Sequence, residues 1–347
     1  MPCLNPMLAY QTDKVNPETG KKQYRFLGAL KTYDVDDQLR EYGTVNIYDD
    51  FGKYIVNPET GEIINRAKIL ACGQCIGCRT KRAASWADRI LMEAQSYDDV
   101  YFLTLTYDEV NVPLSMSKDG VTSLTLRPKD LQDFIKRLRR DQEYHYGNRI
   151  KFYGVGEYGE QFHRPHYHMI AFGMICPDIK ESHRNKSGRM IHTSDRIARI
   201  WNKGIVEVEH LTWELAAYAA RYCVKKLGKA ESDFYEIFGI VPEFQRCSKD
   251  FGKAYFDEHM KDIYNYDEIY LPTASGGRKV KPPKYFDKLY DDVYPAQMAE
   301  IRHNREEIAT EALKLKMNRT NLSYLELVQQ QEAAFKNRIK TLRRTLE

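Results

Sequence analysis

The 347-residue sequence has no long apolar run, and its longest such stretch, Met169 to Cys176, is far shorter than the roughly 20 residues that cross a membrane. The opening MPCLNPMLAYQTDK lacks the basic and then apolar pattern of a secretory signal peptide. Charge of one sign is scarcely in excess, with 53 Lys and Arg against 49 Asp and Glu, so composition alone does not indicate a polyanionic partner. The phosphate-binding pattern GxxxxGK[ST] is also missing, so no helicase motor is visible. The missing signal pattern and the missing apolar span predict a soluble, intracellular protein.

Hydrophobic periodicity in the middle of the chain predicts alternating strands and helices. After a helix over 79–96, the expected order is a strand at 100–107, a helix at 127–141, strands at 150–158 and 166–173, a helix at 194–202 with Ser194 or Asp195 near its cap, a strand at 205–211 and a helix at 212–229. The order β-α-β-β-α-β is that of the split-βαβ, ferredoxin-like fold. We therefore expect an α+β protein whose antiparallel sheet carries its helices on one face.

The two ends of the chain differ from this core. The turn-forming hexapeptide VNPETG occurs at 15–20 and again at 56–61, which predicts β-hairpins in the N-terminal segment 1–66. The core, with a cysteine cluster at its start, is expected over 67–265. The C-terminal extension 266–347 is charged, and it is predicted to be helical at its end.

Two of the nine histidines stand two residues apart, in HRPHYH. On a strand, His166 and His168 would project from the same face, as half of a metal site. Glu157 ends the preceding strand and can complete a two-histidine, one-carboxylate set, with Glu160 as a competing third ligand. Polar residues on a half-exposed strand are the plainer interpretation of the pair.

Two tyrosines lie four residues apart in ELAAYAARYCVKK, on one face of a predicted helix. Tyr218 and Tyr222 are surrounded by alanines, and Lys225 follows them, with Lys226 less favoured. Core packing also explains such a pair, because the chain holds 25 tyrosines. A nearby ammonium and a metal-polarised phosphate would activate a phenol for nucleophilic attack.

Five motifs, in this order, resemble the HUH endonucleases that initiate rolling-circle replication, and most closely the replication initiation proteins of the Microviridae, especially those of gokushoviruses. The motifs are CGQCIGCR, FLTLTYD, GEYGEQFHRPHYH, AAYAARYCVKK and PEFQRCSKDFGKAYFDEH. The resemblance runs from Cys3 to about Tyr290. We recognise no motif in the remaining C-terminal residues.

The resemblance implies a metal site for Mg²⁺ or Mn²⁺ and a two-tyrosine active site, whose residues are Glu157, His166, His168, Tyr218, Tyr222 and Lys225. Such proteins nick one strand of circular phage DNA at the origin, remain joined to its 5′ phosphate, and later cut and rejoin the displaced strand. Phage origin DNA, as duplex and as single strand, and a host helicase and DNA polymerase are the implied partners. The host bacterial cytoplasm is the implied location.

Three cysteines have the spacing C-x₂-C-x₂-C, at Cys72, Cys75 and Cys78. A structural zinc ion needs four ligands, for which Cys3 is the plausible fourth and Cys247 the other candidate. Iron–sulfur ligation uses a similar spacing, but its usual fourth cysteine followed by proline is missing nearby. Free thiols in a tight turn are the remaining alternative.

Basic residues are candidates for phosphate contacts, with tyrosines and phenylalanines available to stack on bases. The basic face of the predicted helix at 127–141, the loop before the histidines and the segment 274–285 contain them. The named candidates are Lys136, Arg137, Arg139, Arg140 and Arg164. A solvated helix face explains the first four equally well.

Two other functions fit parts of this pattern. A zinc-stabilised single-strand-binding protein would use the same histidines and tyrosines only for stacking and packing. A single-tyrosine transposase or relaxase would need only one of the two tyrosines.

Overall fold

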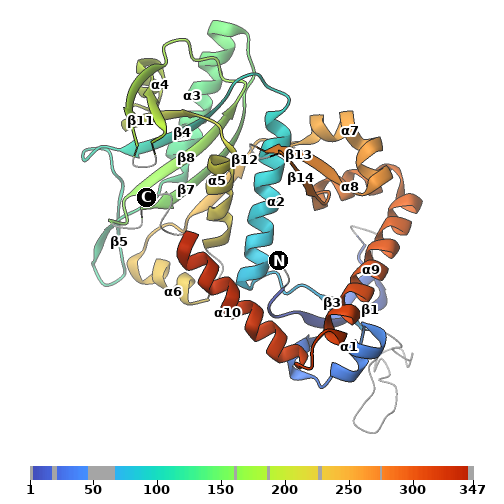
Figure 1. Cartoon of the computed structure of the whole chain (residues 1–347). Coiled ribbons are helices and arrows are strands. Elements are labelled where there is room, and N and C mark those ends of the chain that lie inside the picture. The colour runs from blue at the N-terminus through green and yellow to red at the C-terminus, as the bar shows by residue number, and fades with distance from the viewer. Residues whose placement is uncertain are drawn as a thin grey trace. The chain divides into compact units, whose positions relative to one another are not determined.

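The structure of the chain is a computed structural model. It describes residues 3–17, 22–45, 67–159, 162–185, 188–225, 229–273 and 276–342. The description does not include the side chains of residues 13, 222–225, 229–232, 273 and 339–342. The chain folds into two compact units. The first comprises Met1–Arg79 and Asp291–Thr345, and the second chiefly Thr80–Tyr290. Figure 1 labels the elements of both units.

The second unit is built on an antiparallel sheet, which within the described residues has seven strands in the order β12-β7-β8-β4-β11-β10-β9. Strand β8 lies between β4 and β7 and is antiparallel to both, which is the placement of a split βαβ unit. The predicted α+β class and antiparallel sheet are confirmed. The strands are β4 (Val100–Tyr107), β7 (Lys151–Tyr158), β8 (Pro165–Phe172), β9 (Lys180–Arg184), β10 (Met190–Thr193), β11 (Gly204–His210) and β12 (Phe244–Cys247).

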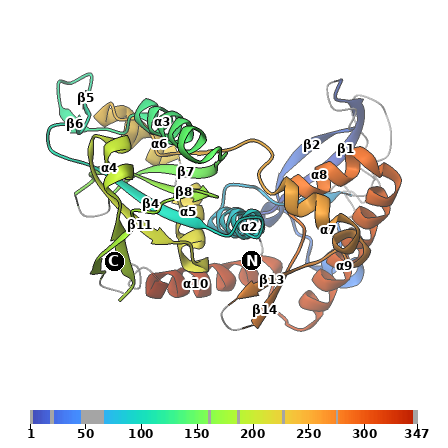
Figure 2. The same ribbon diagram turned by 90° about the horizontal axis from the view of Figure 1, so that it is seen from above.

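Helices cover both faces of this sheet, so the expectation of helices on one face was wrong (Figure 2). Leu103 and Tyr167 point to one face and pack with α3 and α4. Phe102 and Ile170 point to the other face and pack with α2 and α5, because neighbouring strand residues alternate between faces. Both faces of the central strands are therefore apolar. The four helices are α2 (Ile76–Ala94), α3 (Pro128–Tyr146), α4 (Asp195–Trp201) and α5 (Trp213–Lys225).

The ends of these elements follow ordinary capping rules. Ser194 is the N-cap of α4, since its Oγ accepts a hydrogen bond from the backbone N–H of Ile197 at 3.1 Å. Gly147 ends α3 in the left-handed region at φ 61°. The helix predicted over 212–229 is described as α5 from Trp213 to Lys225; residues 226–228 lie outside the description, and α6 follows them.

Smaller elements complete the second unit. Two short hairpins, β5–β6 and β13–β14, are antiparallel pairs. Between α7 and α8 the rings of Tyr264 and Tyr290 stack with centroids 3.9 Å apart. The bounds are β5 (Leu114–Met116), β6 (Thr122–Leu124), α6 (Lys229–Phe238), α7 (Lys253–Tyr266), β13 (Ile269–Thr273), β14 (Gly276–Val280) and α8 (Lys284–Val293).

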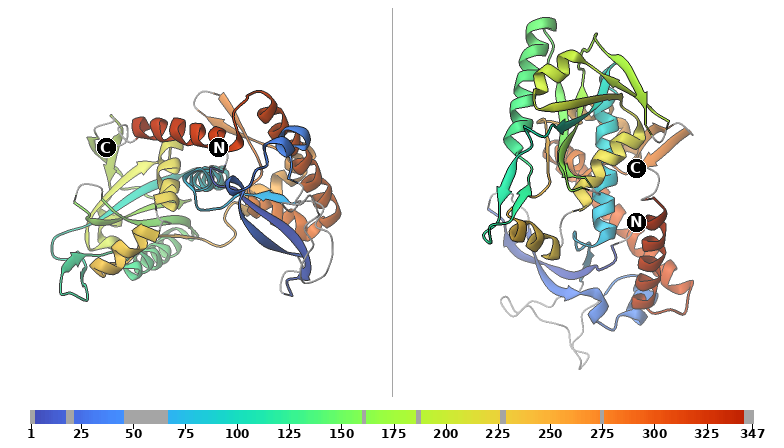
Figure 3. Two further views of the ribbon diagram at one scale, coloured as in Figure 1. Left: turned by 90° about the horizontal axis from the view of Figure 1, so that it is seen from below. Right: turned by 90° about the vertical axis from the view of Figure 1, so that its left-hand side faces the viewer.

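The first unit joins the start of the chain to its last helices. Leu8, Leu30 and Leu39 share one apolar core with Met317 and Val328. The N-terminal and C-terminal segments, which were predicted as separate regions, therefore fold together. Figure 3 shows the long β1–β2 hairpin in blue and the last two helices in red. The first copy of VNPETG is described only to residue 17, and the second copy lies outside the described residues. The elements are β1 (Met7–Val15), β2 (Lys22–Ala29), α1 (Asp36–Tyr42), β3 (Lys68–Leu70), α9 (Pro295–Asn318) and α10 (Tyr324–Leu342).

Arg40 fastens the turn between α9 and α10 to α1. Its guanidinium donates hydrogen bonds to the carbonyl of Thr320 at 2.7 Å and to that of Leu322 at 2.9 Å. It also donates to the carbonyl of Met317, so three backbone acceptors at a helix end are satisfied by one side chain.

Among the described helices, none combines the length and the apolar character that a membrane span requires.

Candidate metal and nucleophile site

The register of the β7–β8 hairpin brings the three predicted metal ligands together. Glu157 lies directly opposite His166, and His168 lies two residues further along the same face of β8. Glu157 Oε1 is 2.6 Å from His166 Nε2 and 2.9 Å from His168 Nε2. The competing ligand Glu160 lies outside the described residues.

Each histidine is held through its other ring nitrogen. His166 Nδ1 is 3.1 Å from the backbone carbonyl oxygen of Arg164, which can only accept, so Nδ1 carries the proton there. His168 Nδ1 is 3.1 Å from the Thr104 hydroxyl on β4. These contacts leave both Nε2 atoms directed at Glu157, an arrangement typical of metal-binding histidines.

The electrostatics of the site favour a charged carboxylate between two imidazoles. Glu157 is only 1% exposed, and burial alone would raise its pKa, but the contacts with His168 and His166 outweigh that effect and lower the pKa to about 2. Burial lowers the pKa of His168. For His166, burial also acts downward, but the hydrogen bond to Glu157 makes the net pKa shift upward.

The donor set fits a divalent metal ion. The ligand atoms of Glu157, His166 and His168 lie within 4.8 Å of one another. Among the described residues, the second carboxylate oxygen, Glu157 Oε2, is buried without a hydrogen-bond partner, which is costly unless something else binds there. Two imidazoles and one carboxylate also leave coordination positions open for water and substrate.

Tyr218 reaches this ligand set from helix α5. Its hydroxyl donates a hydrogen bond to Glu157 Oε1 at 3.3 Å, and its ring meets that of His168 edge-on, with centroids 5.1 Å apart. The helix can approach the sheet closely because Ala216 and Ala220, on its inner face, are fully buried. The structure thus places one predicted nucleophile beside the predicted metal ligands.

Tyr222 and Lys225 lie on α5, one and two turns beyond Tyr218. Their side chains are outside the described part of the structure, and Lys226 is outside it altogether. Arg221 was not predicted as a site residue, yet its guanidinium lies over the Tyr218 ring, 5.5 Å from the centroid. Its place between the two tyrosines was the only signal for it in the sequence.

An open cleft of about 200 Å³ continues from His168 and Tyr218 across the sheet. Arg189 pairs with Glu209 at 3.1 Å on one side of the cleft, so its wall carries both signs of charge. Sequence patterns missed this wall, because the β9–β10 hairpin that supplies part of it was not predicted. The cleft is lined by Phe102, Thr104, His168, His183, Asn185, Arg189, Ile191, Glu207, Glu209, Leu215 and Tyr218.

The basic residues of α3 lie on the other face of the sheet, away from this site. Arg137 donates to the carbonyl of Ile200 at 2.9 Å, at the end of α4. Arg139 donates to Ser248 Oγ at 3.1 Å. Lys136 and Arg140 are exposed. A phosphate group bound by this helix would therefore lie on the opposite face of the sheet from His166 and His168.

Arg164 is placed differently, in the loop that leads into β8. Its guanidinium forms an ion pair with Glu109 at 2.7 Å and donates to the carbonyl of Tyr107 at 2.8 Å. Its own carbonyl contacts His166. Arg164 thus orients His166, a predicted metal ligand, through its backbone carbonyl, whatever its side chain binds.

Comparison with known proteins identifies the family. Residues 100–227, which include the ligand set and both tyrosines, match the family described as replication-associated protein ORF2/G2P. Over 311 residues the chain is 32% identical to the Replication-associated protein ORF2 of Spiroplasma virus 4, with 88% of this chain and 91% of that protein covered. The chain belongs to the gokushovirus-like replication-associated proteins of the Microviridae.

Two further relatives show the same family membership. The Replication-associated protein VP4 of Bdellovibrio phage phiMH2K is 28% identical over 254 residues, which cover 70% of this chain and 76% of that protein. The Replication-associated protein ORF4 of Chlamydia phage 1 is 32% identical over 224 residues, which cover 63% of this chain and 53% of that protein. No solved structure matches the chain.

Proposed function

We propose that this chain initiates phage DNA replication by nicking one strand at the origin through a tyrosine, with a divalent metal ion at Glu157, His166 and His168. One observation carries the proposal: the Tyr218 hydroxyl is 3.3 Å from the same carboxylate oxygen that both histidines contact. Family membership supports the role in replication. A nucleophile and a phosphate-binding ion would then share one small site.

The proposed step is an attack on a phosphodiester. The tyrosine hydroxyl gives up its proton and its oxygen forms a bond to phosphorus, the bond from phosphorus to the 3′ oxygen breaks, and that oxygen takes up a proton to become a free 3′ hydroxyl. The 5′ end stays joined to the protein as a phosphotyrosine ester. This ester preserves a phosphodiester-like bond, so a 3′ hydroxyl can later reverse the step and reseal a circle.

The chain's residues have distinct tasks in this reaction. Glu157, His166 and His168 would hold Mg²⁺ or Mn²⁺, which neutralises charge on the scissile phosphate when bound. Tyr218 and Tyr222 would supply the two nucleophiles, one for each cleavage. Lys225 is proposed to assist as a base or as a phosphate contact.

The DNA strand next to the scissile phosphate is proposed to lie in the cleft beside Tyr218. Tyr218, which is partly exposed, offers aromatic surface in this cleft, where an unpaired base can stack. Host helicase and polymerase are the proposed partners, in the bacterial cytoplasm.

The test uses purified protein, Mg²⁺ or Mn²⁺, and a labelled single-stranded oligonucleotide carrying the origin of its own replicon. A denaturing gel is scored for label that stays attached to the protein after boiling. We expect a metal-dependent adduct that is lost in His166→Ala. Tyr218→Phe and Tyr222→Phe, tested for cleavage and for rejoining, should each lose at least one of the two steps.

Tyr144→Phe is the matched control, because Tyr144 is exposed on α3, on the other face of the sheet. That variant should form the adduct at the wild-type rate. DNA binding without any adduct, with every metal tried, would instead support a single-strand-binding protein. An adduct and rejoining that survive the loss of one tyrosine would support a single-tyrosine enzyme.

A further inference from the structure

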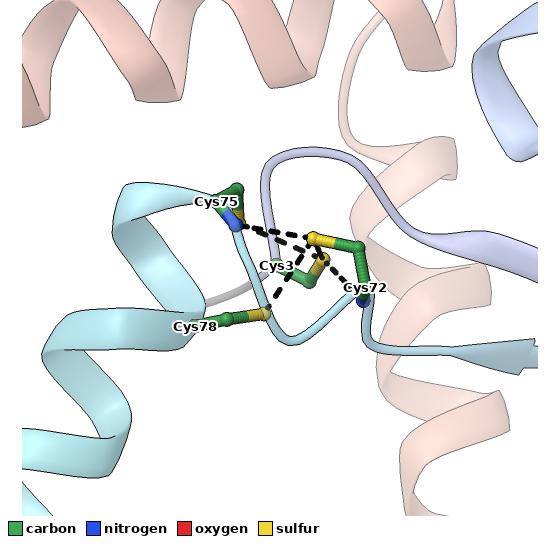
Figure 4. A group of neighbouring side chains, drawn as sticks. All are labelled: Cys3, Cys72, Cys75 and Cys78. Atoms are coloured by element: carbon green, nitrogen blue, oxygen red, sulfur yellow. Dashed lines mark hydrogen bonds between the residues drawn. The ribbon is translucent and has the colours of Figure 1, made fainter. Parts of the chain in front are cut away.

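Four cysteines converge on one point in the first unit, away in sequence from the histidine and tyrosine motifs (Figure 4). Cys3 comes from the start of the chain, Cys72 and Cys75 from the turn after β3, and Cys78 from the first turn of α2. The Sγ atom of Cys3 is 3.5 Å from that of Cys72 and 3.8 Å from that of Cys75, and the Sγ atoms of Cys72 and Cys78 are 4.0 Å apart. All four sulfurs lie within 4.8 Å of one another.

These separations are those of a tetrahedral ion site. A Zn–S bond of about 2.3 Å places neighbouring sulfurs of a tetrahedron about 3.8 Å apart. A disulfide would need a separation of about 2.05 Å, and none of these four cysteines is disulfide-bonded. Sulfurs that surround a single point also leave no room for a cluster of several irons, in which the cysteines are divided among separate irons.

Backbone N–H groups point at the sulfurs, as expected for thiolates. The N–H of Leu4 donates to Cys75 Sγ at 3.2 Å. The N–H of Cys72 donates to Cys3 Sγ at 3.3 Å, and the N–H of Cys75 donates to Cys72 Sγ at 3.3 Å. Hydrogen bonds to sulfur favour the charged form, which is the form that binds metal.

The same geometry identifies the fourth ligand. Cys3 lies among the other three, whereas Cys247 is on strand β12 of the second unit, where it pairs with Tyr153 on β7. Sequence spacing left both cysteines open as candidates. The position of the first residues of the chain beside the turn after β3 decides between them.

We propose that Cys3, Cys72, Cys75 and Cys78 bind one structural zinc ion that closes the first unit. The ion would join the start of the chain to residues 69 to 75 positions later, next to the apolar core that Leu4 and Cys75 border. Four protein ligands leave no open position for a substrate, so the ion supports folding rather than chemistry. This proposal is independent of the nicking activity.

The first experiment measures metal in the full-length protein, purified without chelator, by mass spectrometry. We expect one zinc per chain, and replacement by Co²⁺ should give the intense visible absorption of a tetrahedral thiolate site. Cys3→Ser and Cys72→Ser should each retain less than a tenth of the wild-type zinc after dialysis. Cys176→Ser and Cys247→Ser are matched controls outside the group, and both should keep the full amount.

A second experiment does not depend on whether the cysteine variants fold. Zinc is removed from the native protein with a chelator and then restored, while hydrogen exchange is followed by mass spectrometry. Exchange in β1 and β3 should rise at least tenfold on removal and return to its starting rate with zinc, while β8 stays protected. Protein that carries no metal, carries iron, or keeps zinc in Cys3→Ser would overturn the proposal.

Discussion

Two hydrogen bonds outside the ligand set decide which nitrogen of each histidine faces Glu157. The carbonyl of Arg164 fixes the orientation of His166, and the Thr104 hydroxyl fixes that of His168. Sequence reasoning found the histidines and the carboxylate by their spacing. It did not single out Thr104, although FLTLTY is one of the motifs, because a threonine in a strand is ordinary until its partner is known.

Replacing Thr104 with valine tests this positioning role. Valine keeps the shape of the side chain but cannot form a hydrogen bond with His168 Nδ1, so the imidazole loses one constraint on its orientation. We expect Mn²⁺ binding about 10-fold weaker, with adduct formation recovering at high Mn²⁺ concentration. A metal titration of the adduct rate separates this effect from a simple loss of folded protein.

Two variants serve as controls for Thr104→Val. Thr104→Ser keeps the hydroxyl and should restore Mn²⁺ binding. Thr122→Val makes the same change at an exposed position of the β5–β6 hairpin and should leave binding unchanged. Equal metal affinity in Thr104→Val and wild type would show that the hydroxyl does not orient His168.

At the level of elements, the position of Tyr218 depends on how closely α5 approaches the sheet. Ala216, Ala219 and Ala220 are buried along this contact, where larger side chains would push the helix outward. The alanines around Tyr218 and Tyr222 are visible in the sequence, and such small side chains allow a helix to approach a sheet closely. The sequence did not predict that α5 packs on the face of the sheet away from α3. An apolar stripe shows that one side of a helix is buried, but it does not show which face of the sheet buries it.

Ala216→Leu tests the dependence on this contact. Extra volume in a well-packed interior costs about 1–3 kcal/mol, and part of the strain should be relieved by outward movement of α5. We expect a lower melting temperature and a slower adduct, with Mn²⁺ affinity near wild type, since the ligands come from β7 and β8.

The control for Ala216→Leu makes the same substitution at Ala254, which is exposed on α7. Ala254→Leu should change neither stability nor adduct rate. If Ala216→Leu keeps the wild-type adduct rate despite a clear loss of stability, the distance between α5 and the hairpin does not limit the reaction.

The elements that sequence reasoning missed share a physical cause. Every residue of β9 is exposed, so its KESHR sequence carries no hydrophobic alternation to mark a strand. In contrast, strand β4 was predicted with its observed bounds, because VYFLTLTY is almost wholly apolar and β-branched or aromatic. Strongly hydrophobic segments thus predicted the strands that carry the predicted ligands. The exposed, polar β9 had no such pattern, so part of the cleft wall was not predicted.

For the whole molecule, pairing between distant segments was the least predictable property. The core that Leu8 and Leu30 share with Met317 and Val328 joins residues about 300 positions apart, and no local pattern indicates such a partner. The predicted boundaries 1–66, 67–265 and 266–347 follow composition along the chain. The first compact unit instead brings the first and last segments together.

The absence of a GxxxxGK[ST] pattern from this chain gives a prediction about strand separation. Purified chain mixed with origin plasmid, metal and ATP should nick the plasmid without separating its strands. ATP hydrolysis should stay at the level of the protein-free blank. Adding a helicase should then release single strands from the nicked plasmid.

A double variant with Tyr218→Phe and Tyr222→Phe tests whether the helicase requires a nick to separate the strands. With the helicase present, it should release no single strands from the intact plasmid. Strand separation driven by ATP with the purified chain alone would contradict the proposed dependence on a host helicase.

The β7–β8 hairpin also bears on the order in which the active site forms during synthesis. All three ligands lie within residues 157–168, so they can meet through local contacts, which form within microseconds in a hairpin. Tyr218 follows 50 residues after His168, and a ribosome adding about 5–20 residues per second needs seconds to reach it. The three predicted ligands can therefore meet on a nascent chain that does not yet contain Tyr218, and under the proposed function cleavage would begin only when α5 has been made.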